Sequence, residues 1–201
     1  MATTGNNARG LVPARRQDGQ PPGAANRYPT GSNRAILMIG DAVYLNADRK
    51  IQRFDQQATA AGPGVLGAVV GLLNSDGRPL THVSEKKIGV SAAGFVLVCD
   101  DPNVLFEVQC SASMGPSQVG HFATLVSVGT SPGVTANGKS GFQLSDTTVV
   151  TAAGHPFQIY SLAPTELDGL GGPNNNVLVR ISNHHFNRST RLIGPLEAAD
   201  A

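Results

Sequence analysis

One segment, residues 94–110, constrains the fold more than any other part of the chain; it reads GFVLVCDDPNVLFEVQC. Val, Leu and Phe dominate the runs on both sides of an Asp-Asp-Pro-Asn sequence, and these residue types favour strands. Asp and Asn bond to their own backbone in turns, while Pro presets the backbone dihedral φ. The segment therefore predicts a β-hairpin with two largely buried strands.

Short apolar runs separated by turn residues recur along the rest of the chain. The 24 glycines and 13 prolines supply many turn positions, and runs with helical periodicity are scarce. This pattern predicts an all-β fold, an antiparallel β-sandwich or barrel, in a single domain. The expected strands lie within residues 36–39, 42–45, 51–54, 65–73, 80–83, 88–99, 104–110, 120–128, 142–144, 147–151, 156–162 and 177–181.

Residues 1–34 differ in composition from the domain expected over residues 35–201. They carry five arginines against one acid, together with Pro, Gly and Asn, and offer little apolar surface to bury. We expect an extended, partly disordered N-terminal arm, either a plain leader or a segment that orders across a neighbouring subunit. The candidate partner-binding residues in it are Arg9, Leu11, Val12, Arg15, Arg16, Arg27 and Tyr28.

The charge content gives no broad bias toward nucleic acid or an anionic membrane, since charged residues are 14% and the net charge is +1. No stretch approaches the roughly 18 apolar residues of a membrane helix, and the N-terminus lacks a signal-type apolar run. We therefore expect a soluble protein made in a cytoplasm. Cys99 and Cys110 would not face each other across the hairpin, so we expect buried thiols without a disulfide.

The sequence contains few residue patterns that indicate a catalytic or metal-binding site. His184 and His185 are adjacent, so on a strand they point to opposite faces and do not form a metal pair. Asp100 and Asp101 are interpreted as caps of the turn. Nucleophile-elbow, Walker and dinucleotide motifs are absent from the sequence, and we predict no enzymatic activity, no cofactor and no metal site. The lack of Trp counts against a sugar-binding surface.

The order of segments carries a resemblance. GDAVYLNADRKIQRF is followed by VLGAVVGLLNSDGRP and GFVLVCDDPNVLFEVQ, then by a Gly/Ser-rich middle, HPFQIYSLAP and NNNVLVRISNHHF. Over residues 35–186 this order resembles the head decoration, or capsid cement, proteins of tailed bacteriophages. The phrase DPNVLFEVQ and the late strand that runs into an Asn-His pair are its most specific parts.

The resemblance implies a β-rich structural protein of the virion with no catalytic residues to transfer. It implies binding to the major capsid protein on the outer capsid surface, after synthesis in the bacterial host cytoplasm. Decoration sites lie on or near symmetry axes, so self-association as a homotrimer, or second a dimer, is expected. Nucleic acid and membranes are not expected partners. The alternative is a receptor- or glycan-binding module of the virion tail or spike.

Overall fold

The structure of the chain is a computed structural model. It describes residues 8–31, 36–54, 64–80, 87–88, 93–127, 139–151, 154–163 and 174–186. Within these ranges there are twelve strands and a short 3-10 helix. Their bounds are β1 (Val12–Arg16), β2 (Asn26–Pro29), β3 (Ala42–Leu45), β4 (Ile51–Arg53), β5 (Gly67–Leu73), β6 (Phe95–Cys99), β7 (Val104–Gln109), η2 (Pro116–Gln118), β8 (Phe122–Ala123), β9 (Leu125–Ser127), β10 (Phe142–Leu144), β11 (Phe157–Leu162) and β12 (Asn176–Ile181).

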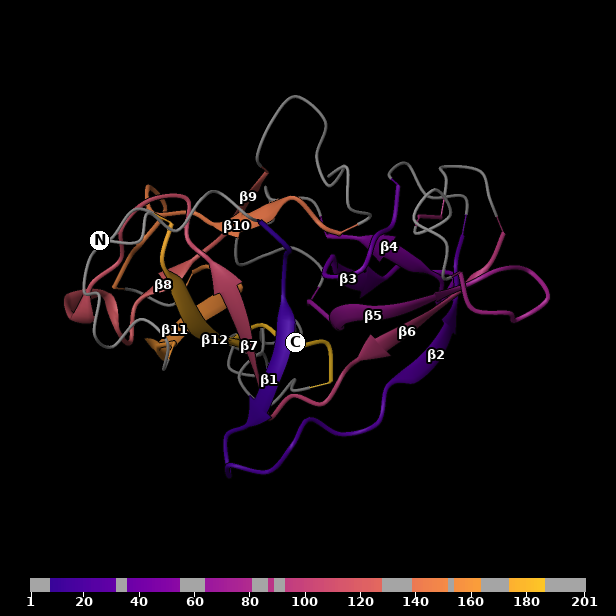
Figure 1. The fold of residues 1–201 in the computed structure, drawn as a ribbon, viewed down its shortest axis with the longest axis horizontal. Coiled ribbons are helices and arrows are strands. Elements are labelled where there is room, and N and C mark those ends of the chain that lie inside the picture. Colours follow the sequence, from indigo (N-terminus) through magenta and orange to yellow (C-terminus); the bar gives the residue numbers. More distant parts are fainter. Residues whose placement is uncertain are drawn as a thin grey trace, which may run out of the picture.

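Two five-stranded antiparallel sheets make up the molecule, with β9 and β10 as a small additional pair. Sheet A has the order β1-β7-β12-β11-β8, and sheet B has the order β2-β6-β5-β3-β4. Figure 1 shows sheet A in the left half and sheet B in the right half. The predicted all-β fold of packed antiparallel sheets is confirmed.

Sheet B curls until its two outer strands meet. An isolated parallel bridge joins Thr30, directly after β2, to Ile51 at the start of β4. The curled sheet encloses one of the two apolar cores, because alternate side chains of its strands point inward. The buried members of this core are Leu37, Val43, Ile51, Leu66, Val69, Leu72, Ile88, Val96 and Val98.

The second core lies between the sheets. From sheet B it receives Ala42, Ala68 and Cys99, which point away from the enclosed core, and from sheet A it receives the inward side chains of β7, β11 and β12. Phe54 and Phe157 meet in it edge to face, with ring centroids 6.3 Å apart. The two faces of sheet B thus contribute to two different cores.

The predicted hairpin is wrong in its pairing, although both of its strands are present. β6 pairs with β2 and β5 in sheet B, whereas β7 pairs with β1 and β12 in sheet A. Each strand thus has a hydrogen-bonded neighbour on both sides within its own sheet. The turn over residues 100–103 therefore carries the chain from one sheet to the other.

Residues 8–31 belong to the body in this structure and do not form an arm apart from it. β1 is added to the edge of sheet A and β2 to the edge of sheet B. Just before β1 the chain crosses residue 40, where the Leu11 N–H donates to the Gly40 carbonyl at 2.8 Å. The backbones are so close there that a Cβ on Gly10 would overlap the Gly40 carbonyl oxygen.

Most of the predicted strands are confirmed within one or two residues, while two of them are wrong. Residues 36–39 and 147–151 contain single bridges, Leu37 to Ile88, Ile39 to Lys139 and Val150 to Phe122, rather than named strands. The predicted run over 120–128 holds two strands, β8 and β9, which belong to different sheets. Of the predicted strand over 88–99, the structure shows the bridge at Ile88 and β6 from Phe95, while residues 89–92 lie outside the described residues. Close approach at Gly94, whose added Cβ would lie 2.7 Å from the Leu73 carbonyl oxygen, marks the start of β6. Most of the segment 80–83 lies outside the described residues.

Candidate protein-binding surface

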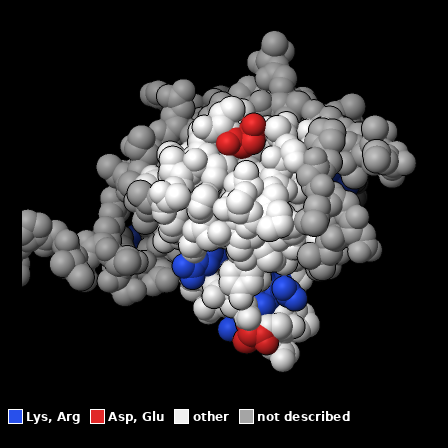
Figure 2. Space-filling view, turned by 90° about the vertical axis from the view of Figure 1, so that its left-hand side faces the viewer, with Lys and Arg blue, Asp and Glu red and all other residues white. Residues whose placement is uncertain are grey.

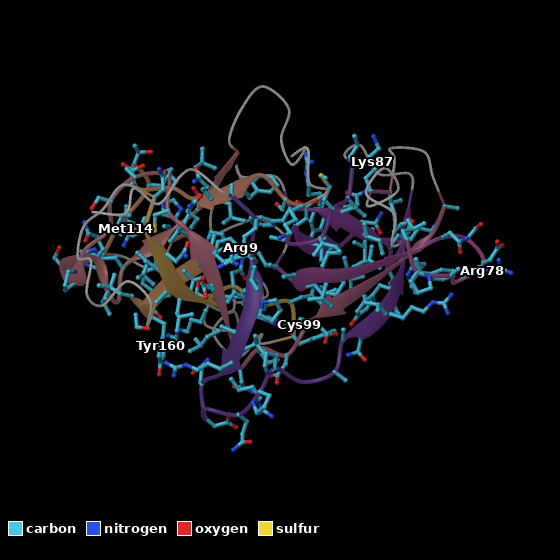
Figure 3. The ribbon with its side chains drawn as sticks, viewed as in Figure 1. Arg9, Arg78, Lys87, Cys99, Met114 and Tyr160 are labelled. Carbon is cyan, nitrogen blue, oxygen red and sulfur yellow. The ribbon has the colours of Figure 1, made fainter. Side chains whose placement is uncertain are left out.

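An uncharged surface with exposed apolar side chains covers the β8–β11 end of sheet A. We call it the neutral patch and define it as Val119, Phe122, Val150, Gln158 and Tyr160. Val119, Val150 and Tyr160 are 41%, 38% and 41% exposed, which is high for such side chains. Figure 3 shows Tyr160 at the left-hand side of the molecule, far from Arg78 at the opposite end.

Backbone pairing holds the neutral patch together. Phe122 lies opposite Gln158 on one side and opposite Val150 on the other, so the three side chains share one face of the sheet. The Gly120 N–H donates to the Ile159 carbonyl at 2.8 Å, which places Val119 and Tyr160 on either side of this bond. Phe122 and Tyr160 thus lie on strands and Val150 at a bridge to β8, while Val119 lies in the turn after η2, next to the Gly120 bond to β11.

The neutral patch has one charged neighbour in the described residues of sheet A: Arg180 of β12 lies opposite Gln158, and its Nε donates to the Gln158 side-chain oxygen at 2.6 Å. The chain segment that supplies part of the patch carries no charge. Residues 108–138 contain no Asp, Glu, Lys or Arg, and this stretch supplies Val119 and Phe122. Figure 2, which views the molecule from this end, shows a broad uncharged area with charged side chains toward its borders. Depletion of charge combined with exposed aromatic and aliphatic groups is the composition of the centre of a protein–protein interface.

The N-terminal residues predicted to contact a partner are mostly engaged within the chain. Leu11 is 1% exposed and lies in the core between the sheets, so it is not available as an anchor on a partner. Arg9 forms an ion pair of 2.5 Å with Glu107, and half-buried Val12 lies opposite Glu107 in the β1–β7 register. This part of the segment therefore stabilises sheet A.

The other predicted arginines differ in their exposure to a partner. Arg16 lies 3.3 Å from an Asp101 oxygen and 3.7 Å from one of Asp18. The guanidinium of Arg27 stacks on the Phe95 ring, 3.7 Å from its centroid. Arg15 is exposed and has no ion pair to any described residue, so it keeps its charge for solvent or a partner.

Tyr28, the last predicted partner residue, binds a carboxylate of its own chain. Its hydroxyl donates to Asp100 Oδ2, and the Asn26 amide donates to both Asp100 oxygens at 2.9 and 3.0 Å. Burial together with Asp100 raises the pKa of the Tyr28 phenol far above its usual range. Asp100 thus ties β2 to the end of β6 instead of capping the turn. The predicted cap is correct for Asp101, whose Oδ1 accepts from the Asn103 N–H at 2.9 Å.

The cysteines are buried and form no disulfide, as predicted. Figure 3 places Cys99 near the middle of the molecule, at the junction of the sheets. Burial, assisted by the neighbouring Asp100 carboxylate, raises the pKa of Cys99 to about 11. This thiol is therefore protonated at neutral pH and a poor nucleophile.

The described ranges hold neither a cluster of metal-ligating side chains nor a helix that could span a membrane. No group of three or more His, Cys, Asp or Glu side chains in them is arranged to hold a metal ion. None of their helices has the length and apolarity needed to cross a membrane. Comparisons of the chain with known protein families, curated proteins and solved structures found no match.

The neutral patch was not predicted from the sequence. Its sequence signal is the absence of charge over residues 108–138, which the low overall charge content hides. Val119 and Val150 are far apart in sequence. They come together because Val150 pairs with Phe122 of β8, while Gly120, next to Val119, bonds to Ile159 of β11. No local pattern marks either residue as exposed.

Proposed function

We propose that the chain is a structural protein of a bacteriophage virion that binds the outer surface of the capsid and stabilises it by linking neighbouring capsomers. Its partners are the major capsid protein and further copies of itself, with a homotrimer as the expected assembly. The neutral patch is the observation that carries the proposal, because its own side chains are uncharged and its exposed apolar groups are suited to contact another protein. The order of segments over residues 35–186 supports the same class.

The sheet edges are poorly suited to strand addition, which favours binding of a partner through the faces of the sheets. The two N-terminal edge strands each contain a proline, Pro13 in β1 and Pro29 in β2. A proline lacks the N–H that an added strand would need, and it is a common device against edge-to-edge pairing. In β1 a register shift between Pro13 and Arg15 interrupts the edge further. Contacts with capsid proteins are therefore expected at the neutral patch, with exposed Arg15 as a charged contact outside it.

Electron microscopy of virions that carry the chain with a C-terminal label tests the location. Many labelled copies over the head are expected. Label on a few copies at the tail would overturn the proposal in favour of the receptor- or glycan-binding alternative, and virions without label would overturn both.

Occupancy on purified capsids tests the surface. Tyr160→Glu places a charge in the middle of the neutral patch and is expected to lower capsid occupancy at least tenfold, since burying an unpaired carboxylate in an interface is costly. Ser75→Glu adds the same charge at an exposed turn next to Arg78, at the opposite end of the molecule, and should bind as the unmodified chain does. Equal occupancy of both variants would exclude the neutral patch as the contact surface.

A further inference from the structure

The end of β12 is joined to the segment before β5 by a tight backbone seam. Val65 bridges His184 in parallel; its N–H donates to the Asn183 carbonyl, and its carbonyl accepts from the His185 N–H, both at 2.8 Å. A Cβ on Gly64 would lie 3.0 Å from the His185 Cα, so the two backbones are in direct contact. The seam holds residues 183–186 against the body.

The imidazole of His184 is buried at this seam and is only 3% exposed. Its Nδ1 accepts a hydrogen bond from the Phe186 N–H at 3.1 Å. Nδ1 therefore carries the lone pair, and the proton of the neutral ring is on Nε2. Nε2 is buried, and the ring also interacts with the Leu66 backbone.

A second proton would have to bind Nδ1. It would turn the acceptor of the Phe186 N–H into a donor that points at another donor, and it would add a charge to a buried ring. The charged and titratable groups near the ring are Asp100, Asp101 and His185. Burial lowers the pKa of His184 and His185 adds to this effect, whereas Asp100, the hydrogen bond with the Leu66 backbone and Asp101 oppose it.

The nearest carboxylate already has other partners. Asp100 accepts from Tyr28 and from Asn26, so it is committed to β2. Protonation of His184 therefore conflicts with its hydrogen bond without gaining an ion pair within 4.0 Å in this conformation.

We propose that residues 183–186 are a pH-sensitive latch, closed while His184 is neutral and released from Val65 when Nδ1 binds a proton. Release frees Phe186, which is already 56% exposed and whose ring contacts both histidines. It also frees the point from which residues 187–201 continue. The latch is independent of the function proposed above.

Hydrogen exchange of the intact chain tests the latch at the Val65 and His185 amides. In the open state His184 titrates near its ordinary value of about 6.5, so at pH 5 opening is favoured by up to about 30-fold relative to pH 8. The protection factors of both amides, after correction for the intrinsic exchange rate, are expected to fall toward this limit. Amides in the β2–β6 pairing, such as that of Val98, should keep their protection.

His184→Asn is the matched variant, because the Asn side-chain oxygen can take the place of Nδ1 as an acceptor but does not titrate. It is expected to abolish the pH dependence at Val65 and His185, whereas His185→Asn should retain it. Protection that does not change between pH 8 and pH 5, or that changes equally in His184→Asn, would overturn the latch. Should that variant fail to fold, NMR titration of the unmodified chain decides: an His184 pKa at or above about 6.5 also overturns it.

Discussion

At the scale of single residues, one carboxylate explains much of how the two N-terminal strands are held. Asp100 is 6% exposed, and its oxygens accept from two side chains of β2. A buried carboxylate needs such donors, because an ionised group without them is strongly unfavourable in the interior. Asp101, one residue later, is satisfied locally by the turn.

The sequence predicted only the second of these roles, for a physical reason. The Asp101 bond reaches two residues along the chain, and the residue types of the turn determine it. The Asp100 bonds reach 72 and 74 residues back along the chain to Tyr28 and Asn26. Nothing local distinguishes the two acids, and the tertiary contact decides between them.

Removing the Tyr28 hydroxyl should therefore be costly. Tyr28→Phe leaves Asp100 with one donor fewer in a buried position, and we expect a loss of about 1.5–3 kcal/mol in the free energy of unfolding, as for hydrogen bonds to charged groups. Denaturant titration measures it. Tyr44→Phe is the control, because the Tyr44 hydroxyl donates at 2.6 Å to a neutral partner, Gln52; its loss should be nearer 1 kcal/mol. Equal losses of unfolding free energy in the two variants would contradict a hydrogen bond from Tyr28 to a charged Asp100 carboxylate.

The thiol of Cys99 should be inert in the folded protein. Its pKa of about 11 and its burial keep it protonated and covered at pH 8. A thiol-specific reagent is expected to label neither cysteine in the native chain and both after denaturation. Peptide mapping that finds Cys99 modified natively, at the rate of an exposed thiol, would contradict this expectation.

At the scale of elements, strand positions were more predictable than strand partners. Apolar runs such as those of β7 and β12 mark strands wherever they pair, because most of their side chains are buried on both faces. Pairing depends on which edges are open once the whole chain is folded. β6 and β7 are separated by a short turn, yet β2 and β1 occupy the edges at which they could have met.

The crossing of residues 10 and 40 gives an element-scale prediction. Both glycines have positive φ, +69° and +92°, and a Cβ on Gly40 would overlap the Arg9 carbonyl oxygen. Gly40→Ala is expected to lower the free energy of unfolding by at least about 3 kcal/mol, since backbone strain adds to the overlap. Chemical denaturation measures the loss.

Gly19→Ala separates strain from overlap. Gly19 has a similar φ of +84°, but a Cβ there would meet nothing within 4 Å. We expect this variant to lose only about 1–2 kcal/mol, the ordinary cost of the left-handed region for a residue with a Cβ. Similar losses in the two variants would show that the crossing is not as close as the structure places it.

At the scale of the whole molecule, the N-terminal segment connects the two sheets. β1 completes sheet A, β2 completes sheet B, and the bridge from Thr30 to Ile51 joins the outer strands of sheet B. An Arg-rich, Pro- and Gly-containing sequence predicts an arm because it has little apolar surface of its own to bury. It is nevertheless ordered over residues 8–31, because the open edges of β6 and β7 offer hydrogen bonds that its own sequence does not reveal.

Truncation tests whether this segment is an arm or part of the body. Deletion of residues 1–7 keeps every described contact of residues 8–31 and gives the reference thermal midpoint. Deletion of residues 1–31 removes both edge strands and the buried Leu11, and cooperative unfolding should be lost. Leu11→Ala keeps the chain length and is expected to cost about 2–5 kcal/mol, as for other buried Leu residues. If a chain without residues 1–31 unfolds with an unchanged midpoint, the segment is a detached arm and not part of the body.

Capsid occupancy of the 1–7 deletion can then be measured on a folded protein, so a loss of binding would report on the contact and not on the fold.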